Sequence, residues 1–245
     1  LNARDYADSS TVSRTEFTFE FDVDGDGVID TDKGDQTVSF GLVDGNKVKT
    51  RSLTMFGWKS FYDLNQAEKD QLVIPAAEVT AGNEDGLDLR VIRYGPTMYI
   101  FVEGKQVAVI DLTKVAKDSG DTASGITADT KMFVYLRHFD DDRTDGVEIP
   151  FSITEDVAPV TITSQGANGT VSTVNTVNHY VNNVRKTTTS DVHFKGEKLT
   201  LTVKPNKGYK TTAVTLSGAD ILSQMAKGSD GKLTHSFVVD KANNA

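Results

Sequence analysis

The segment from Phe17 to Phe40 constrains the fold more than any other part of the sequence, because it reads as a strand, an acidic turn and a second strand. Phe17, Phe19 and Phe21 alternate with polar residues, which is the period-2 pattern of a half-buried β-strand. The alternation resumes at Thr37–Phe40, after the turn. We therefore predict two strands joined by a turn that carries a dense cluster of negative charge.

The turn is rich in aspartate, and this density of carboxylates predicts a bound cation. The aspartates are Asp22, Asp24, Asp26, Asp30, Asp32 and Asp35. Carboxylates this close repel one another unless a cation lies among them, and calcium accepts about six to eight hard oxygen ligands in flexible geometry. The spacing Asp22-x-Asp24-x-Asp26-Gly27 directs three side chains toward one centre, and the glycine permits the sharp turn that follows.

The predicted calcium ligands are Asp22, Asp24, Asp26, Val28, Asp30 and Asp32. The loop is not a helix-loop-helix calcium hand, because Lys33 occupies the position of the bidentate Glu and the entering segment has strand periodicity. It resembles the DxDxDGxxD loops of dockerins and thrombospondin type 3 repeats, with Asp30 at the matching acidic position. The alternative is a solvated, acidic hairpin tip that holds no ion.

The composition excludes several classes of function. The net charge of −9 argues against a nucleic-acid partner, which requires a basic surface, and against anionic membranes. No apolar run approaches the ~20 residues of a membrane-spanning helix, so we expect no membrane insertion. The absence of cysteine excludes disulfides, thiolate catalysis and cysteine-ligated zinc.

Both ends of the sequence read as cuts in a longer protein. The chain begins at Leu1 without a methionine and ends shortly after a strand-like run. A chain without cysteine is compatible with the cytosol and also with Gram-positive cell-surface proteins. We expect a monomeric fragment of a larger bacterial protein that is extracellular, either on the cell surface or secreted.

Regularly spaced short strands dominate the first part of the sequence. Leu87–Tyr94, Met98–Val102 and Gln106–Ile110 are separated by tight turns that contain glycine, which predicts an antiparallel meander. Two further strands are predicted at Lys131–Arg137 and Val147–Ile153. The one plausible short helix before residue 110 is Tyr62–Leu72. This regular spacing of short strands and turns predicts an all-β fold, an antiparallel jelly-roll β-sandwich.

The run Leu87–Leu112 resembles the central strands of the concanavalin A-like lectin/glucanase superfamily, including laminin-G-type domains. The later run Met132–Ile153 resembles the closing strands of these domains, where the last strand pairs near the first. The resemblance covers roughly residues 15–155 and implies a lectin-like β-sandwich. This architecture supports lectins, hydrolases and inert spacers, so the fold alone does not assign a function.

The composition changes near Ala158, where aspartate and aromatic residues give way to Thr, Val, Asn and Lys. Gly196–Val203, followed by Pro205–Tyr209, resembles the divergent B-repeat-type β modules of bacterial surface proteins. The resemblance implies a small stalk or spacer module. We predict two domains, a lectin-like β-sandwich over residues 1–157 and a second, smaller β module over residues 158–245.

A catalytic reading is possible for the first strand. Alternation places Glu20, Asp22 and Asp24 on one face, as paired-carboxylate glycoside hydrolysis requires. The pattern is one carboxylate short of the nucleophile and acid strand of laminarinase-like glycosidases, and it runs directly into the acidic turn. We therefore predict that the protein is not an enzyme and keep a glycosidase fragment as an alternative.

Aromatic and polar residues indicate a glycan site on the first domain. The single tryptophan and a nearby tyrosine could stack on sugar rings, or could instead fill the core. A second acidic loop, His138–Gly146, could accept hydrogen bonds from hydroxyl groups, or could simply be solvated. The predicted ligand-binding residues are Trp58, Tyr62, His138, Asp140, Asp142 and Arg143. The predicted function is a calcium-stabilised, non-catalytic carbohydrate-binding or adhesive module, and the first alternative is a structural stalk segment.

Overall fold

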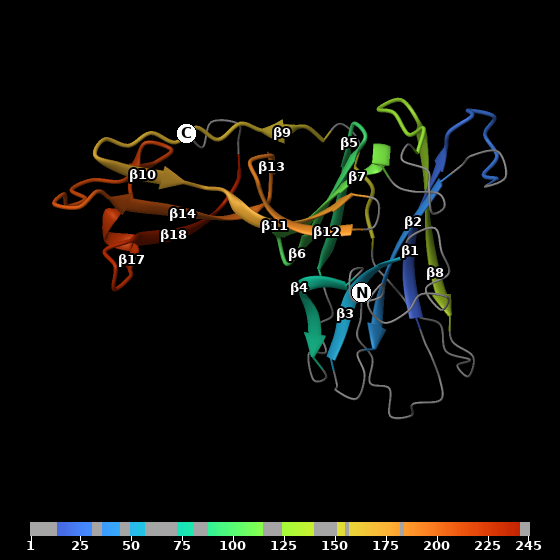
Figure 1. Ribbon diagram of the computed structural model, residues 1–245, viewed down its shortest axis with the longest axis horizontal. Coiled ribbons are helices and arrows are strands. Elements are labelled where there is room, and N and C mark those ends of the chain that lie inside the picture. Colours follow the sequence, from blue (N-terminus) through green and yellow to red (C-terminus); the bar gives the residue numbers. More distant parts are fainter. Residues whose placement is uncertain are drawn as a thin grey trace. The chain divides into compact units, whose positions relative to one another are not determined.

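The computed structural model describes residues 14–30, 36–44, 50–56, 73–80, 88–114, 124–139, 151–154, 157–181 and 184–240. Nearly all regular structure in these ranges is β-strand, which confirms the predicted all-β class (Figure 1). The exceptions are two short 3-10 turns, η3 (Leu112–Lys114) and η4 (Leu222–Gln224). No helix in these ranges is long and apolar enough to cross a membrane. The predicted helix Tyr62–Leu72 lies outside the described residues.

The chain divides into two units that are each defined by their internal contacts. The first unit comprises residues 1–103, 107–153 and 178–187, and the second comprises residues 104–106, 154–177 and 188–245. Residues 178–187 therefore belong with the first unit, although their place in the sequence falls in the predicted second domain. That each predicted domain folds independently stays a prediction.

One sheet of the first unit contains the strand that leads into the acidic turn. Its order is β4-β3-β2-β1-β8, and neighbouring strands in it pair antiparallel (Figure 1). The strands are β1 (Arg14–Asp22), β2 (Gln36–Asp44), β3 (Thr50–Phe56), β4 (Val73–Thr80) and β8 (Lys131–Phe139). The predicted strand pair around the acidic turn is present as β1 and β2. β8 pairs with the other side of β1, whereas the resemblance implied that the last closing strand, predicted at Val147–Ile153, lies near the first.

A second sheet has the order β12-β11-β7-β6-β5. Its strands are β5 (Leu89–Tyr94), β6 (Thr97–Val102), β7 (Lys105–Asp111), β11 (Asn175–Val181) and β12 (Val184–Ser190). The predicted meander is present as β5, β6 and β7, which are consecutive neighbours. β11 pairs with β7 in parallel, with Asn178 opposite Ala108, although these residues lie far apart in the sequence.

The turn between β6 and β7 shows how residues next to each other in the sequence form the meander. Only Glu103 and Gly104 separate the two strands, and their φ angles are +52° and +78°. A type I′ turn requires positive φ at both central positions, and its twist matches that of the flanking strands. The predicted glycine turn is therefore the element that sets this hairpin.

β6 marks the centre of the first unit. Met98, Ile100 and Phe101 are at most 1% exposed, and Tyr99 and Val102 are also buried. Successive strand residues point to opposite faces, so burial of consecutive residues means that both faces of β6 are covered. On β1, Phe19 and Phe21 are buried and the Arg93 guanidinium of β5 lies 5.4 Å from the Phe21 ring centroid. This contact joins the two sheets in a β-sandwich-like arrangement, and the jelly-roll topology stays a prediction.

The second unit contains a four-stranded sheet of order β10-β14-β18-β17 and two short pairs, β9 with β13 and β15 with β16. The sheet strands are β10 (Gly169–Ser172), β14 (Lys198–Pro205), β17 (Ala226–Lys227) and β18 (Leu233–Val238). The short strands are β9 (Pro159–Val160), β13 (His193–Phe194), β15 (Thr215–Leu216) and β16 (Ala219–Asp220). Leu201, Val203, Val214 and Ile221 form its apolar core.

The prediction of a strand at Val147–Ile153 is wrong for the residues of it that the structure describes, which begin at Phe151. Residues Phe151–Thr154 are not in a strand, and Phe151 and Ile153 are 66% and 71% exposed. The alternation of Phe151 and Ile153 suits a strand, but a strand also needs a neighbouring backbone edge. Because no pairing is present for these residues, the pattern alone does not produce one.

Candidate functional site

The acidic loop begins at the last residue of β1. Asp22 is 2% exposed and terminates the strand, whereas Asp24 and Asp26 lie in the following loop and are exposed. Both Asp22 oxygens accept backbone hydrogen bonds, Oδ1 from the Gly25 N–H at 2.7 Å and Oδ2 from the Gly27 N–H at 3.0 Å. These bonds fold the loop around the Asp22 carboxylate.

The two exposed aspartates hold the rest of the loop in the same way. The Asp26 N–H donates to Asp24 Oδ1 at 3.1 Å, and the Val28 N–H donates to Asp26 Oδ1 at 2.8 Å. Aspartate side chains favour such turns because they accept hydrogen bonds from the backbone two residues further on. The loop conformation therefore follows from the regular spacing of aspartates in the sequence.

The loop brings three of the predicted metal ligands together. One carboxylate oxygen from each of Asp22, Asp24 and Asp26 lies within 4.8 Å of the other two. Two charges at ~4 Å repel by about 1 kcal/mol in water and by about 4 kcal/mol at the effective dielectric constant of a protein surface. Asp30 is half-buried and does not belong to this group, and Asp32 lies outside the described residues.

The loop is supported from one side by residues 124–130. A Cβ atom on Gly125 would lie 2.8 Å from Val23 Cγ1, so this segment packs closely against the residue that follows Asp22. The Arg93 guanidinium holds the segment by donating to the carbonyl oxygens of Thr130 at 2.6 Å and Thr127 at 2.9 Å. It also donates to the carbonyls of Ala128 and Gly95.

Arg93 is a partly desolvated cation. Burial lowers the pKa of Arg93 from its ordinary value, because removal from water disfavours the charged form. An arginine stays protonated in spite of such a shift, so its N–H groups remain donors. Its planar fork therefore fixes several carbonyls at once, next to the base of the acidic loop.

The catalytic alternative, which rests on Glu20, Asp22 and Asp24, stays untested. Asp24 lies beyond the end of β1, so strand alternation no longer governs its direction. Both oxygens of Asp22 accept backbone hydrogen bonds, which suits a loop-forming role.

The predicted glycan-binding residues stay predictions. Trp58, Tyr62, Asp140, Asp142 and Arg143 lie outside the described residues. The backbone of His138 lies in β8, where this residue pairs with Thr15 of β1.

A buried polar cluster in the second unit was not anticipated from the sequence. Glu197 is fully buried, and its carboxylate accepts hydrogen bonds from Asn175 Nδ2 at 2.9 Å and from the Phe194 N–H at 3.1 Å. His193 Nδ1 lies 3.3 Å from both carboxylate oxygens. The i,i+4 spacing of His193 and Glu197 across a Lys-Gly turn was the available signal, but it does not reveal burial.

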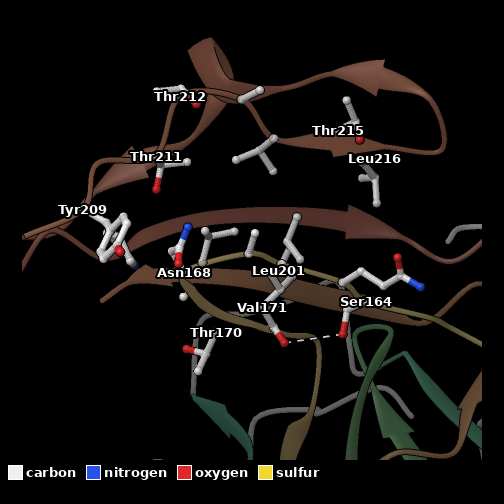
Figure 2. Close-up of a pocket in the computed structure, with 18 of the residues that line it drawn as sticks. Ser164, Asn168, Thr170, Val171, Leu201, Tyr209, Thr211, Thr212, Thr215 and Leu216 are labelled. Carbon is white, nitrogen blue, oxygen red and sulfur yellow. Dashed lines mark hydrogen bonds between the residues drawn. The ribbon is translucent and has the colours of Figure 1, made fainter. Parts of the chain in front are cut away.

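The second unit also contains a cleft of about 690 Å³. Figure 2 shows Thr211, Thr212, Thr215 and Leu216 on one side of it, with Val171 and Leu201 of the sheet on the facing side. Tyr209 lies at one end and is 57% exposed. Known ligand pockets occupy roughly 300–1,000 Å³, so this cleft has the size of a binding site.

The lining of the cleft is mainly neutral. Its apolar residues include Val171, Leu201, Val203, Val214 and Leu216. Hydroxyl and amide groups come from Ser164, Gln165, Asn168, Thr170, Thr211 and Thr212, among others. The lining contains no carboxylate, and its one charged residue is Lys210. The sequence offered no sign of this cleft, because its lining comes from the segments 162–173, 201–205 and 209–216, which only the fold brings together.

Comparisons with known proteins give this chain no relative: no family model, curated protein or solved structure matches it.

Proposed function

We propose that the chain is a non-catalytic binding or adhesive module of an extracellular protein, and that calcium stabilises its first unit. The observation that carries the proposal is the convergence of Asp22, Asp24 and Asp26, whose carboxylate oxygens lie within 4.8 Å of one another. Asp22 is anchored by two backbone bonds, so the group is held in place by the chain itself. Each carboxylate oxygen has two lone pairs, and one hydrogen bond leaves the second for a metal ion.

Calcium suits this group better than magnesium or zinc. The available donors are carboxylate and carbonyl oxygens, which are hard ligands, and the chain has no cysteine. Two of the three carboxylates are exposed, so water would complete the coordination shell. We propose the Val28 carbonyl and the carboxylates of Asp30 and Asp32 as the remaining protein ligands.

The same features support an extracellular location. Exposed calcium sites with few fixed ligands bind weakly, and extracellular modules have dissociation constants of about 10⁻⁴–10⁻³ M. A site of this affinity is useful where calcium is abundant and constant. In that setting the ion would act as a permanent structural element rather than as a signal.

Thermal unfolding with and without calcium tests the metal site. A ligand that binds only the folded state adds about 2.7 kcal/mol of stability at a hundredfold excess over its dissociation constant. We expect calcium to raise the melting temperature, EDTA to reverse the rise, and Asp24→Asn to abolish it. Asp88→Asn is the matched control, because Asp88 is also exposed and lies just before β5, outside the loop and outside the segment that supports it. Identical melting curves in calcium and EDTA would refute the metal site.

The binding partner that we propose is a glycan or polysaccharide, contacted through Trp58, Tyr62 and the loop residues His138, Asp140, Asp142 and Arg143. Support for it comes from the residue types alone, since aromatic rings stack on sugars and polar groups bind hydroxyls. A panel of plant, microbial and mucin glycans should give at least one ligand, and its affinity should fall in Trp58→Ala. A panel without a ligand, measured on calcium-loaded protein, would favour the structural stalk instead.

A further inference from the structure

The wall of the second-unit cleft contains a stretch of backbone without partners. Lys210, Thr211, Thr212 and Ala213 lie between the turn after β14 and the start of β15. In the described part of the chain, no hydrogen bond engages their backbone N–H or C=O groups. A stretch of unpaired N–H and C=O groups is a template on which a further strand can pair.

The facing side of the cleft is similarly incomplete. β10 is an edge strand, and the Val171 carbonyl on its outer edge is covered only by the Ser164 hydroxyl, at 3.4 Å. Val171, Leu201 and Val203 contribute apolar side chains to the lining, and Figure 2 shows Val171 and Leu201 on this side of the cleft. The cleft thus combines an apolar floor with free backbone groups, which are the two features of recognition by strand addition.

A segment of the same chain has the complementary features. Phe151–Thr154 is exposed and outside any strand, and Phe151 and Ile153 expose two large apolar side chains at period-2 spacing. No hydrogen bond is formed by these four residues with the described part of the chain. In extended form they span about 13 Å, and they match the four unpaired residues of the cleft wall in number.

We propose that the Phe151–Thr154 segment of one molecule binds as an extended strand in the second-unit cleft of another copy of this chain. Its backbone would pair with Lys210–Ala213, and Phe151 and Ile153 would pack on Val171 and Leu201. The cleft and the segment are different surfaces, so the contact is heterologous and propagates into chains or closes into a ring. The proposal is independent of calcium and of glycan binding.

The charges agree with this occupant. The four-residue segment is uncharged, as is most of the cleft, and two acidic residues, Glu155 and Asp156, follow it in the sequence. Lys210 is the one charged residue of the lining and lies at an end of the unpaired stretch. A strand that places its acidic continuation near Lys210 has a preferred direction in the cleft.

Sedimentation equilibrium of the whole chain tests the proposal. We expect the average mass to rise with concentration between about 1 µM and 1 mM, the range of dissociation constants for a short strand contact. The double variant Phe151→Ser, Ile153→Ser should associate at least tenfold more weakly, and so should Lys210→Glu. Val174→Ser and Lys207→Glu are matched controls, because both residues are exposed and neither lines the cleft.

A peptide supplies the second measurement. The peptide IPFSITED (residues 149–156), blocked at both ends, should bind the double variant and shift the backbone amide resonances of Lys210–Ala213. A peptide with serine in place of Phe151 and Ile153 should neither bind nor shift these resonances. The far-ultraviolet spectra and melting curves of all variants should match the wild type, because every substituted residue is exposed.

Three results would each overturn the proposal. The first is a chain that stays monomeric at all concentrations. The second is self-association that is unchanged by the double variant. The third is a peptide that does not shift the resonances of Lys210–Ala213. The same conclusion holds if a neutral oligosaccharide shifts these resonances and the peptide does not.

Discussion

Replacing Glu197 with alanine is the most direct test of what holds the second unit together. The carboxylate is completely buried and accepts hydrogen bonds from Asn175 Nδ2 and the Phe194 N–H, with His193 Nδ1 at 3.3 Å. His193 is itself only 2% exposed. Glu197→Ala removes the common acceptor and leaves these donors in a site with little access to water.

The expected loss of stability is large. A hydrogen bond to a charged group contributes about 1.5–3 kcal/mol, and a buried donor that is left without a partner costs roughly 1–3 kcal/mol. We expect Glu197→Ala to lower the free energy of unfolding by about 3–5 kcal/mol, because more than one close donor loses the same acceptor. Domains are stable by roughly 5–15 kcal/mol, so the variant should lose at least about a fifth of the stability of the second unit.

Urea unfolding at neutral pH, followed by far-ultraviolet circular dichroism, measures the effect. Each kcal/mol lowers the melting temperature of a domain of 60–100 residues by about 4–8 °C, so a thermal scan should show the same loss. Asp191→Ala is the matched control, because Asp191 is an exposed carboxylate close to His193 in the sequence. Glu197→Gln keeps one acceptor and should fall between the wild type and Glu197→Ala. A loss below about 0.5 kcal/mol for Glu197→Ala, the range of ordinary surface substitutions, would refute the reasoning.

Three further substitutions test other contacts. Arg93→Ala removes the donor to the carbonyls of Thr127 and Thr130. It should lower the free energy of unfolding by about 2–4 kcal/mol and weaken calcium binding. A denaturant melt that shows the same stability as the wild type would contradict this. Gly125→Ala should destabilise the first unit by roughly 1–3 kcal/mol, because the φ of Gly125 is +78° and the new Cβ would lie 2.8 Å from Val23 Cγ1. Gly218→Ala is the control with a smaller expected loss, because Gly218 has a similar φ of +82° but no atom near the new Cβ. Equal losses in the two glycine variants would show that the contact with Val23 is unimportant. Gln106→Met should change stability by less than about 1 kcal/mol, because the buried Gln106 Oε1 has no hydrogen-bond partner among the described residues. A loss above about 2 kcal/mol would indicate that the bond from Gln106 Nε2 to the Val192 carbonyl is essential.

The sequence by itself determined the features that depend on near neighbours. The β5–β6–β7 meander follows from alternating residues and two-residue turns, since a turn such as Glu103–Gly104 fixes the register of the strands on either side. The grouping of Asp22, Asp24 and Asp26 follows in the same way, because each aspartate bends the chain by bonding to backbone within five residues. These interactions are complete within a short segment, so the pattern of residues contains the information.

Only the tertiary structure decided the features that join distant segments. Nothing in the sequence indicated that Asn178–Tyr180 would pair in parallel with Ala108–Ile110, or that these residues would belong to the first unit. Phe151 and Ile153 show the reverse case, in which residues with a strand-like pattern lie exposed and outside any strand. The burial of Glu197 and the two sides of the second-unit cleft likewise depend on segments far apart in the chain. The physical reason is that a residue's burial and pairing are set by the elements packed against it, and local periodicity specifies a face without specifying what covers it.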